Sequence, residues 1–146
     1  MLLFNPSGLG LREDSGGSGR FGAPRGNRKH EGYDFLCKPG QIVRAVIPGK
    51  LVRAYPYAGD VIFAGCRIWG KDWMSKMFYF IPHEHVINKD VLAGEEIGIA
   101  QDISAKYGGG MKPHVHCGLY KLNPTLLVNI EKFLNTEENR LKSGGY

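Results

Sequence analysis

From Tyr33 onward, short apolar runs alternate with turn residues such as Pro39-Gly40 and Pro48-Gly49. Apolar and polar positions alternate within several of these runs, which is typical of β-strands that bury one face. The predicted strands cover residues 33–36, 42–47, 51–54, 61–69, 73–81, 96–100 and 114–121. We therefore predict a mainly β domain built on an antiparallel β-sheet, with a β-roll or sandwich-like architecture.

The two ends of the chain depart from this pattern. Residues 7–29 carry glycine, serine, arginine and proline with almost no apolar periodicity, so we predict a loop-rich arm over 1–29 that packs near the functional site. Near the other end, Asn123 can cap a helix that begins at Pro124. Its apolar face would contain Leu126, Leu127, Ile130, Phe133 and Leu134. We predict an amphipathic helix within 123–146, docked on a β domain over 30–122.

Length and charge narrow the class of protein. The 146 residues are enough for one domain with one core. The chain has 19 Lys+Arg and 14 Asp+Glu, and the net charge of +5 favours encounters with polyanions. The basic residues do not cluster into a strip, so we expect no specific nucleic-acid partner. No apolar run approaches the roughly 18 residues of a membrane span, and we expect a monomer.

The three cysteines show no Cys-x-x-Cys spacing, so we expect free and mostly buried thiols. One disulfide remains an alternative. Residues 1–4 are too few to form the 7–15-residue apolar core of a signal peptide, so we expect none.

Four of the five histidines form two His-x-His pairs, His83/His85 and His114/His116. In a strand, residues i and i+2 project from the same face, so His114 and His116 would lie side by side while Val115 enters the opposite side. One imidazole can then bind a metal while its neighbour transfers protons. The alternative is that these are ordinary surface or turn histidines, since such pairs also arise by chance.

The fifth histidine, His30, stands four residues before Asp34. Zinc that catalyses hydrolysis usually keeps three protein ligands, often imidazole and carboxylate, and one open position for water. His30, Asp34 and one histidine of the 114/116 pair supply such a set. The residues alone therefore predict a hydrolytic zinc site.

Five segments, in order, resemble the motifs of the lysostaphin/LytM-type zinc metallopeptidase domain. The patterns are His-x-Gly-x-Asp, Gly-x-x-Val-x-Ala, Gly-x-Val, Val-x-x-Gly-x-x-Ile-Gly and His-Leu-His, matched near 30–34, 40–45, 49–52, 91–98 and 114–116. The resemblance implies an antiparallel β fold with an open groove. It also implies zinc ligands at His30, Asp34 and His116, with His114 as the unligated general acid/base.

The resemblance further implies hydrolysis of peptide bonds in bacterial peptidoglycan, in the stem peptide or the crosslink. Such an enzyme acts on cell wall, and we expect a phage-encoded origin or release by lysis to bring it there. Arg25, at the edge of the implied groove, is a candidate to bind a substrate carboxylate. Tyr79 is a second candidate substrate contact.

One departure concerns a further catalytic histidine that active members usually carry in a Tyr-x-His stretch. Here the stretch reads Tyr79-Phe80-Ile81, and His83 or His85 just beyond it is a candidate to fill the same space through a shifted loop. The alternative is that both are solvated turn residues. Residues 34–37 and 76–79 are similar to the leukocyte cell-derived chemotaxin branch, which keeps zinc but is regarded as non-peptidase. The alternative function is therefore a non-catalytic zinc-binding module that binds cell wall or a protein partner.

Overall fold

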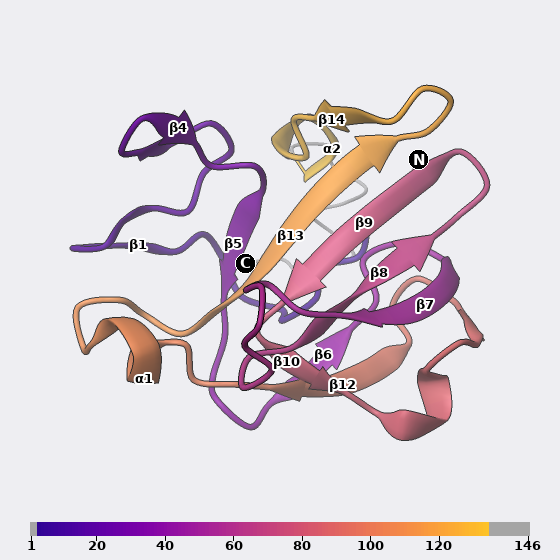
Figure 1. The fold of residues 1–146 in the computed structure, drawn as a ribbon, viewed down its shortest axis with the longest axis horizontal. Coiled ribbons are helices and arrows are strands. Elements are labelled where there is room, and N and C mark those ends of the chain that lie inside the picture. Colours follow the sequence, from indigo (N-terminus) through magenta and orange to yellow (C-terminus); the bar gives the residue numbers. More distant parts are fainter. Residues whose placement is uncertain (1–2, 135–146) are drawn as a thin grey trace.

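The computed structural model describes residues 3–134, and its main feature is a large antiparallel sheet (Figure 1). The strands run in the order β11-β7-β8-β9-β13-β14, and β5 also pairs with β13. Their bounds are β5 Tyr33–Leu36, β7 Gly49–Ala54, β8 Gly65–Trp69, β9 Trp73–Phe78, β11 Asp90–Val91, β13 His114–Lys121 and β14 Leu126–Val128. Strand β13 is central, because it pairs with β9 along one edge and with β5 and β14 along the other.

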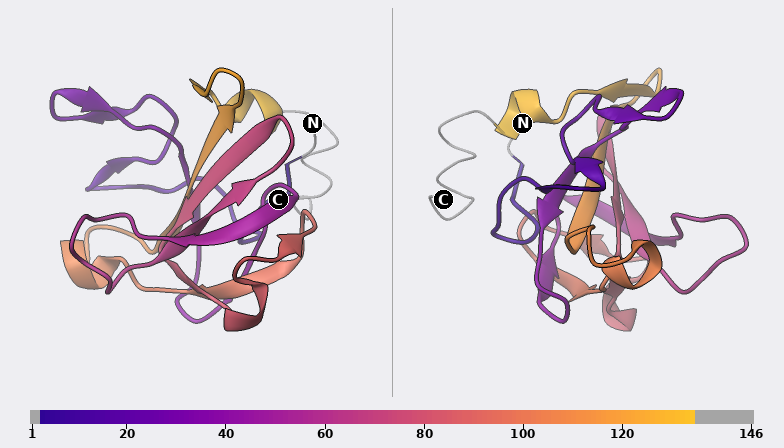
Figure 2. Two further views of the ribbon diagram at one scale, coloured as in Figure 1. Left: turned by 45° about the vertical axis from the view of Figure 1, so that its right-hand side comes forward. Right: turned by 90° about the vertical axis from the view of Figure 1, so that its left-hand side faces the viewer.

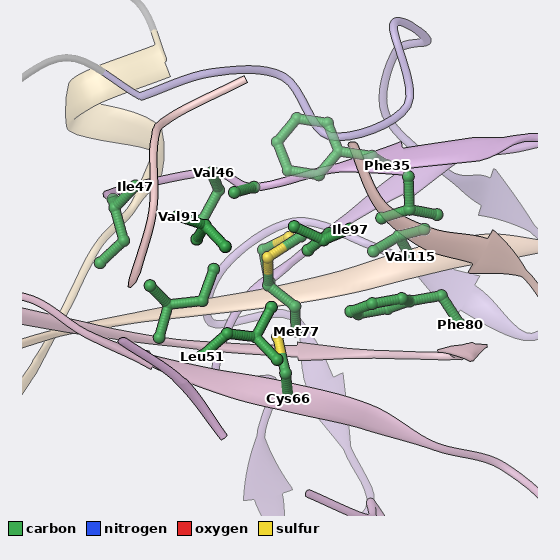
Figure 3. Close-up of a cluster of buried hydrophobic side chains, with 14 of the residues drawn as sticks. Phe35, Val46, Ile47, Leu51, Cys66, Met77, Phe80, Val91, Ile97 and Val115 are labelled. Atoms are coloured by element: carbon green, nitrogen blue, oxygen red, sulfur yellow. The ribbon is translucent and has the colours of Figure 1, made fainter. Parts of the chain in front are cut away.

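A second, three-stranded antiparallel sheet has the order β10-β12-β6. Its strands are β10 Phe80–Pro82, β12 Glu96–Ala100 and β6 Ile42–Arg44. The core is a cluster of buried apolar side chains from both sheets, including Leu51, Met77, Phe80, Ile97 and Val115 (Figure 3). The mainly antiparallel β fold predicted from the sequence is confirmed.

The N-terminal arm forms two small hairpins beside β5 (Figures 1 and 2). Their strands are β1 Glu13–Asp14, β2 Gly17–Ser18, β3 Pro24–Arg25 and β4 Arg28–Lys29. The helices of the described chain are short: the 3-10 helix η1 Glu84–Val86, α1 Ser104–Tyr107 and α2 Glu131–Leu134. None of the helices within 3–134 has the length and apolar character needed to cross a membrane.

The predicted start of the C-terminal helix, at Asn123 and Pro124, is wrong. Asn123 has a φ of 62°, and the chain turns back here. Residues Leu126–Val128 then pair with β13 as β14, which satisfies backbone groups on the free edge of that strand. A helix forms only at Glu131–Leu134, after the buried Ile130. The part of the expected helix beyond residue 134 lies outside the described residues.

Several strand boundaries also differ from the prediction. The strand expected over 42–47 ends at Arg44, and the strand expected over 51–54 begins at Gly49. The strand expected over 61–69 begins at Gly65, because the Asp60 carboxylate accepts the N–H of Ile62 and keeps the preceding segment in a turn. The strand expected over 73–81 is split at Tyr79, whose φ is 79°. This corner ends β9 at Phe78 and passes the chain to β10 in the second sheet. It also places the Tyr79 side chain where the functional site lies.

All three cysteines, Cys37, Cys66 and Cys117, are free and buried. This confirms the expected thiols, and the alternative disulfide does not form. Burial raises the pKa of the Cys37 thiol to about 12, so this group stays protonated at neutral pH.

Candidate metal centre

The pairing of β5 with β13 brings together two of the predicted ligands, because Asp34 and His116 are direct cross-strand partners. Side chains alternate along β13, so Val115 enters the core while His114 and His116 face the opposite side. Phe35 alternates in the same way beside Asp34, and it is also buried in the core. The two short strands therefore anchor the ligands on a packed apolar layer.

His30 reaches the same point from the end of the β3–β4 hairpin. Its backbone N–H donates to Ala23, and its carbonyl accepts from Gly22. The ring Nδ1 lies 3.0 Å from the Arg20 carbonyl oxygen, to which it must donate a proton. Nε2 is then the ring nitrogen that faces Asp34 and His116, as a metal ligand requires.

The three ligand atoms form a nearly equilateral triangle. His30 Nε2 lies 3.0 Å from His116 Nδ1 and 3.2 Å from Asp34 Oδ1. The third side, from His116 Nδ1 to Asp34 Oδ1, is also 3.0 Å. Within residues 3–134, this is the one His/Cys/Asp/Glu group with the spacing to hold a metal ion.

The second oxygen of Asp34 faces positive groups. Arg12 Nε donates to Oδ2 at 3.1 Å, and Arg25 Nη2 lies 3.8 Å from it. Burial alone would raise the pKa of Asp34, but hydrogen bonds with His116 and His30 and the nearby His114 hold it well below the usual value. Asp34 is therefore a carboxylate at neutral pH.

His114 lies beside the three candidate ligands and is 3% exposed. Its Nδ1 donates to the Lys112 carbonyl at 2.9 Å, so Nε2 is the ring nitrogen left to face Asp34 Oδ2 at 3.6 Å. Burial lowers the pKa of His114, against the opposing effect of Asp34, and the imidazole is neutral at pH 7. A neutral imidazole with a free Nε2 can accept a proton.

These groups lie on one pocket of about 480 Å³. Its wall is rich in tyrosine: the Tyr57 hydroxyl lies 2.7 Å from that of Tyr107 and 3.3 Å from that of Tyr79. The Tyr79 ring meets the His114 ring edge-on, with centroids 5.2 Å apart. The basic side chains of the lining are Arg12, Arg25, Arg28, Lys29 and Lys76, and the acidic ones are Glu31 and Asp34. The lining is therefore net positive.

Some predicted site residues lie in this pocket and others do not. Arg25 and Tyr79, the candidate substrate contacts, both line it. His83 and His85 do not: their rings stack on each other, and His83 Nε2 pairs with Glu96 at 2.9 Å. Ile81, where a catalytic histidine was expected, lies on β10 and is 53% exposed.

Sequence reasoning missed Arg12, which is 1% exposed and contacts Asp34 directly. It also missed the contact between Tyr57, which lies between β7 and β8, and Tyr107, which ends α1. Nothing in the local sequence separates Arg12 from the exposed Arg20 of the same arm. The burial of Arg12 arises from packing of the arm against β5, which a local pattern does not encode.

The comparisons with solved structures define the class of fold. Lysostaphin from Staphylococcus simulans, an antimicrobial peptidase, matches with a TM-score of 0.62 and 19% identity over 100% of this chain and 57% of the other. Csd3 from Helicobacter pylori matches with a TM-score of 0.64 and 21% identity over 93% of this chain and 34% of that protein. This chain thus spans about half of the one protein and a third of the other. Its fold is that of the lysostaphin-type peptidases, as the motifs predicted.

Sequence comparison identifies the relatives. No protein-family model matches the chain. Leukocyte cell-derived chemotaxin-2 of Mus musculus is 34% identical over 105 residues, covering 70% of this chain and 68% of the relative. The Bos taurus protein of the same name is 32% identical with the same coverage. The chain belongs to the leukocyte cell-derived chemotaxin-2 family, on the lysostaphin-type fold.

Proposed function

We propose that this protein is a zinc-dependent endopeptidase that hydrolyses peptide bonds in bacterial peptidoglycan. The observation that carries the proposal is the triangle of ligand atoms from His30, Asp34 and His116, which faces a pocket beside His114. The fold, shared with a peptidase that is described as antimicrobial, supports the substrate class.

The donor set fits zinc. Tetrahedral zinc with ligands at 2.0–2.1 Å needs ligand atoms about 3.3 Å apart, and the three sides of the triangle measure 3.0, 3.0 and 3.2 Å. Two imidazoles and one carboxylate are typical of catalytic zinc, whereas structural zinc sites are closed by four protein ligands. Zinc in such a site lowers the pKa of a bound water towards neutrality and polarises a substrate carbonyl.

In this proposal His114 is the general acid/base. Its Nδ1 is held by the Lys112 carbonyl, so the ring cannot turn, and Nε2 is the atom that accepts and returns the proton. Its position beside Asp34, 3.6 Å from Oδ2, keeps it next to the ligands without joining them.

Arg25 and Tyr79 are the proposed substrate contacts. The Arg25 side chain is 23% exposed and its guanidinium is partly held by the Ser18 carbonyl, which leaves N–H groups for a substrate carboxylate. The Tyr79 ring meets the His114 ring edge-on, and in this proposal the Tyr79 hydroxyl donates to a substrate carbonyl. The net positive lining favours anionic peptides of the wall.

A second candidate is a zinc-binding module without catalysis, which binds a peptide or the wall and leaves it intact. The observation that favours it is the composition of the pocket: among the described residues, the histidines of its lining are His30, His114 and His116. Tyr79 stands beside His114, and Ile81 is not among the residues that line the pocket. The relatives carry the name chemotaxin-2, which is not the name of a peptidase, and this supports the non-catalytic candidate.

The deciding experiment is mass spectrometry of soluble fragments released from purified peptidoglycan of several crosslink types. The endopeptidase proposal predicts fragments from the zinc-loaded wild type and from His85→Ala, which alters a histidine outside the pocket. His114→Ala should keep its zinc and release none. Full activity in His114→Ala would contradict the mechanism. If the zinc-loaded wild type releases no fragments, the second candidate, the non-catalytic zinc-binding module, is favoured.

A further inference from the structure

The two carboxylate oxygens of Asp34 are in different surroundings. Oδ1 faces His30 Nε2 at 3.2 Å and His116 Nδ1 at 3.0 Å, so it is the oxygen of the ligand triangle. Oδ2 accepts a hydrogen bond from Arg12 Nε at 3.1 Å. A carboxylate can bind a metal through one oxygen or through both. Here Oδ1 faces the other two ligands, whereas Oδ2 faces Arg12.

Arg12 is fixed along its whole length. Its backbone N–H donates to the Asp34 carbonyl at 2.9 Å, and its own carbonyl accepts from Gly19 at 2.7 Å. Gly19 in turn accepts from the Asp34 N–H at 2.9 Å. A Cβ on Gly19 would lie 2.7 Å from the Asp34 Cβ and 2.9 Å from the Arg12 oxygen, so only glycine allows this approach.

The far end of the Arg12 side chain is held by Asp14. Arg12 Nη1 donates to Asp14 Oδ1 at 2.7 Å, and the same oxygen accepts the Gly16 N–H at 2.7 Å. The other Asp14 oxygen accepts the Lys112 N–H, also at 2.7 Å. Because Asp14 is anchored by two backbone groups, the guanidinium cannot swing away from Asp34.

We propose that Arg12 is a positioning residue that restricts Asp34 to one metal-binding oxygen. The inference rests on the proposed zinc site. The Arg12 Nε–H occupies Oδ2 in a buried, charge-assisted hydrogen bond, the stronger kind of hydrogen bond. Rotation of the carboxylate to present both oxygens would break this bond and leave a buried guanidinium donor unsatisfied. Positions around the metal therefore stay open for water or substrate.

The charges agree with this role. Arg12 is shared between Asp14 and Asp34, so the group of three carries a formal charge of −1, whereas Arg12 and Asp34 alone would be neutral. A buried arginine would otherwise repel a divalent cation nearby. Asp14 therefore lets the Arg12 guanidinium hold the proposed ligand Asp34 without cancelling the attraction of the site for a metal ion.

The test uses cobalt(II) in place of zinc, because the visible absorption of protein-bound cobalt weakens and shifts as its coordination number rises. Wild type, Arg12→Met, Arg12→Lys and Arg53→Met are each loaded with cobalt and compared. Arg53 is the matched control, an arginine outside the pocket lining that pairs with Glu84 at the surface. Circular dichroism and thermal unfolding verify that each variant is folded.

Arg12→Met should lose absorption intensity and shift its bands, as Asp34 becomes free to bind through both oxygens. Arg12→Lys, which keeps a cation near Oδ2, should retain more of the wild-type spectrum, and Arg53→Met should match the wild type. If Arg12→Met fails to fold, Arg12→Met combined with Asp14→Asn removes both buried charges and should show the same spectral change. A folded variant without Arg12 whose spectrum equals that of the wild type overturns the inference and leaves the zinc site standing. A wild type that binds no cobalt overturns the zinc site and the inference with it.

Discussion

Gly32, the central residue of the His-x-Gly-x-Asp motif, offers a sharp test of how the metal centre is built. A Cβ at this position would lie 2.4 Å from the Cys117 carbonyl oxygen and 2.7 Å from Cε1 of the His116 ring. Both contacts are far inside van der Waals distance, and the first involves the backbone of the central strand β13. Gly32→Ala should therefore displace His116, one of the three ligands.

The magnitude follows from these contacts. Forcing a methyl group into a well-packed site costs about 1–3 kcal/mol. At roughly 2–4 °C per kcal/mol for a domain somewhat larger than this one, the melting temperature of the zinc-free protein should fall by about 2–12 °C. Moving a ligand should weaken zinc binding at least as much as loss of an outer-shell partner, which typically costs 10–100-fold.

The assay is competition for zinc against a chromophoric chelator, combined with thermal unfolding of the zinc-free protein. Gly10→Ala is the matched control, because a Cβ at Gly10 meets nothing within 4 Å. It should leave zinc affinity unchanged. A Gly32→Ala variant that binds zinc as tightly as wild type would refute the account of how β5 and β13 position the ligands.

Three further predictions concern stability. Zinc at 100 times its dissociation constant should stabilise the wild type by about 2.7 kcal/mol in thermal unfolding; a chelator should reverse this, and His30→Ala should show no zinc-dependent gain. Because the pKa of Asp34 is depressed in the folded state, the zinc-free wild type should gain stability from this carboxylate above the unfolded pKa of about 3.9 and lose it as pH falls through the folded value. Urea unfolding of wild type and Asp34→Asn should give a stability difference that shrinks as pH falls below about 4; a difference that grows over this acidic range contradicts the assignment. Phe80→Ala should cost about 3–5 kcal/mol in urea unfolding, whereas exposed Ile81→Ala should change stability by less than about 0.5 kcal/mol; equal costs would be inconsistent with the described β10.

Much of the fold could be predicted because its signals are local. The alternation in β13, with Val115 inward and His114 and His116 outward, is a property of any half-buried strand. The ligand triangle of His30, Asp34 and His116 was predicted because it depends on two short motifs. The cross-strand pairing of Asp34 with His116 then brings these motifs together.

The remainder depends on tertiary contacts. Leu126 and Leu127 fit a helical face as well as a strand, and the free edge of β13 decides between them. The burial of Arg12 depends on how the arm packs, and the Tyr79 corner depends on a single positive φ between two apolar runs. His83 and His85 are close to the expected catalytic position in sequence, but the chain has passed into the second sheet, where His83 pairs with Glu96 and His85 stacks on His83.

The central claim is that His30, Asp34 and His116 hold one zinc ion, and elemental analysis of the dialysed protein tests it most directly. The account predicts one zinc per chain in the wild type and in His85→Ala, and none in His30→Ala or His116→Ala. Zinc retained by folded His30→Ala and His116→Ala variants, or absent from a wild type dialysed against zinc, would contradict it.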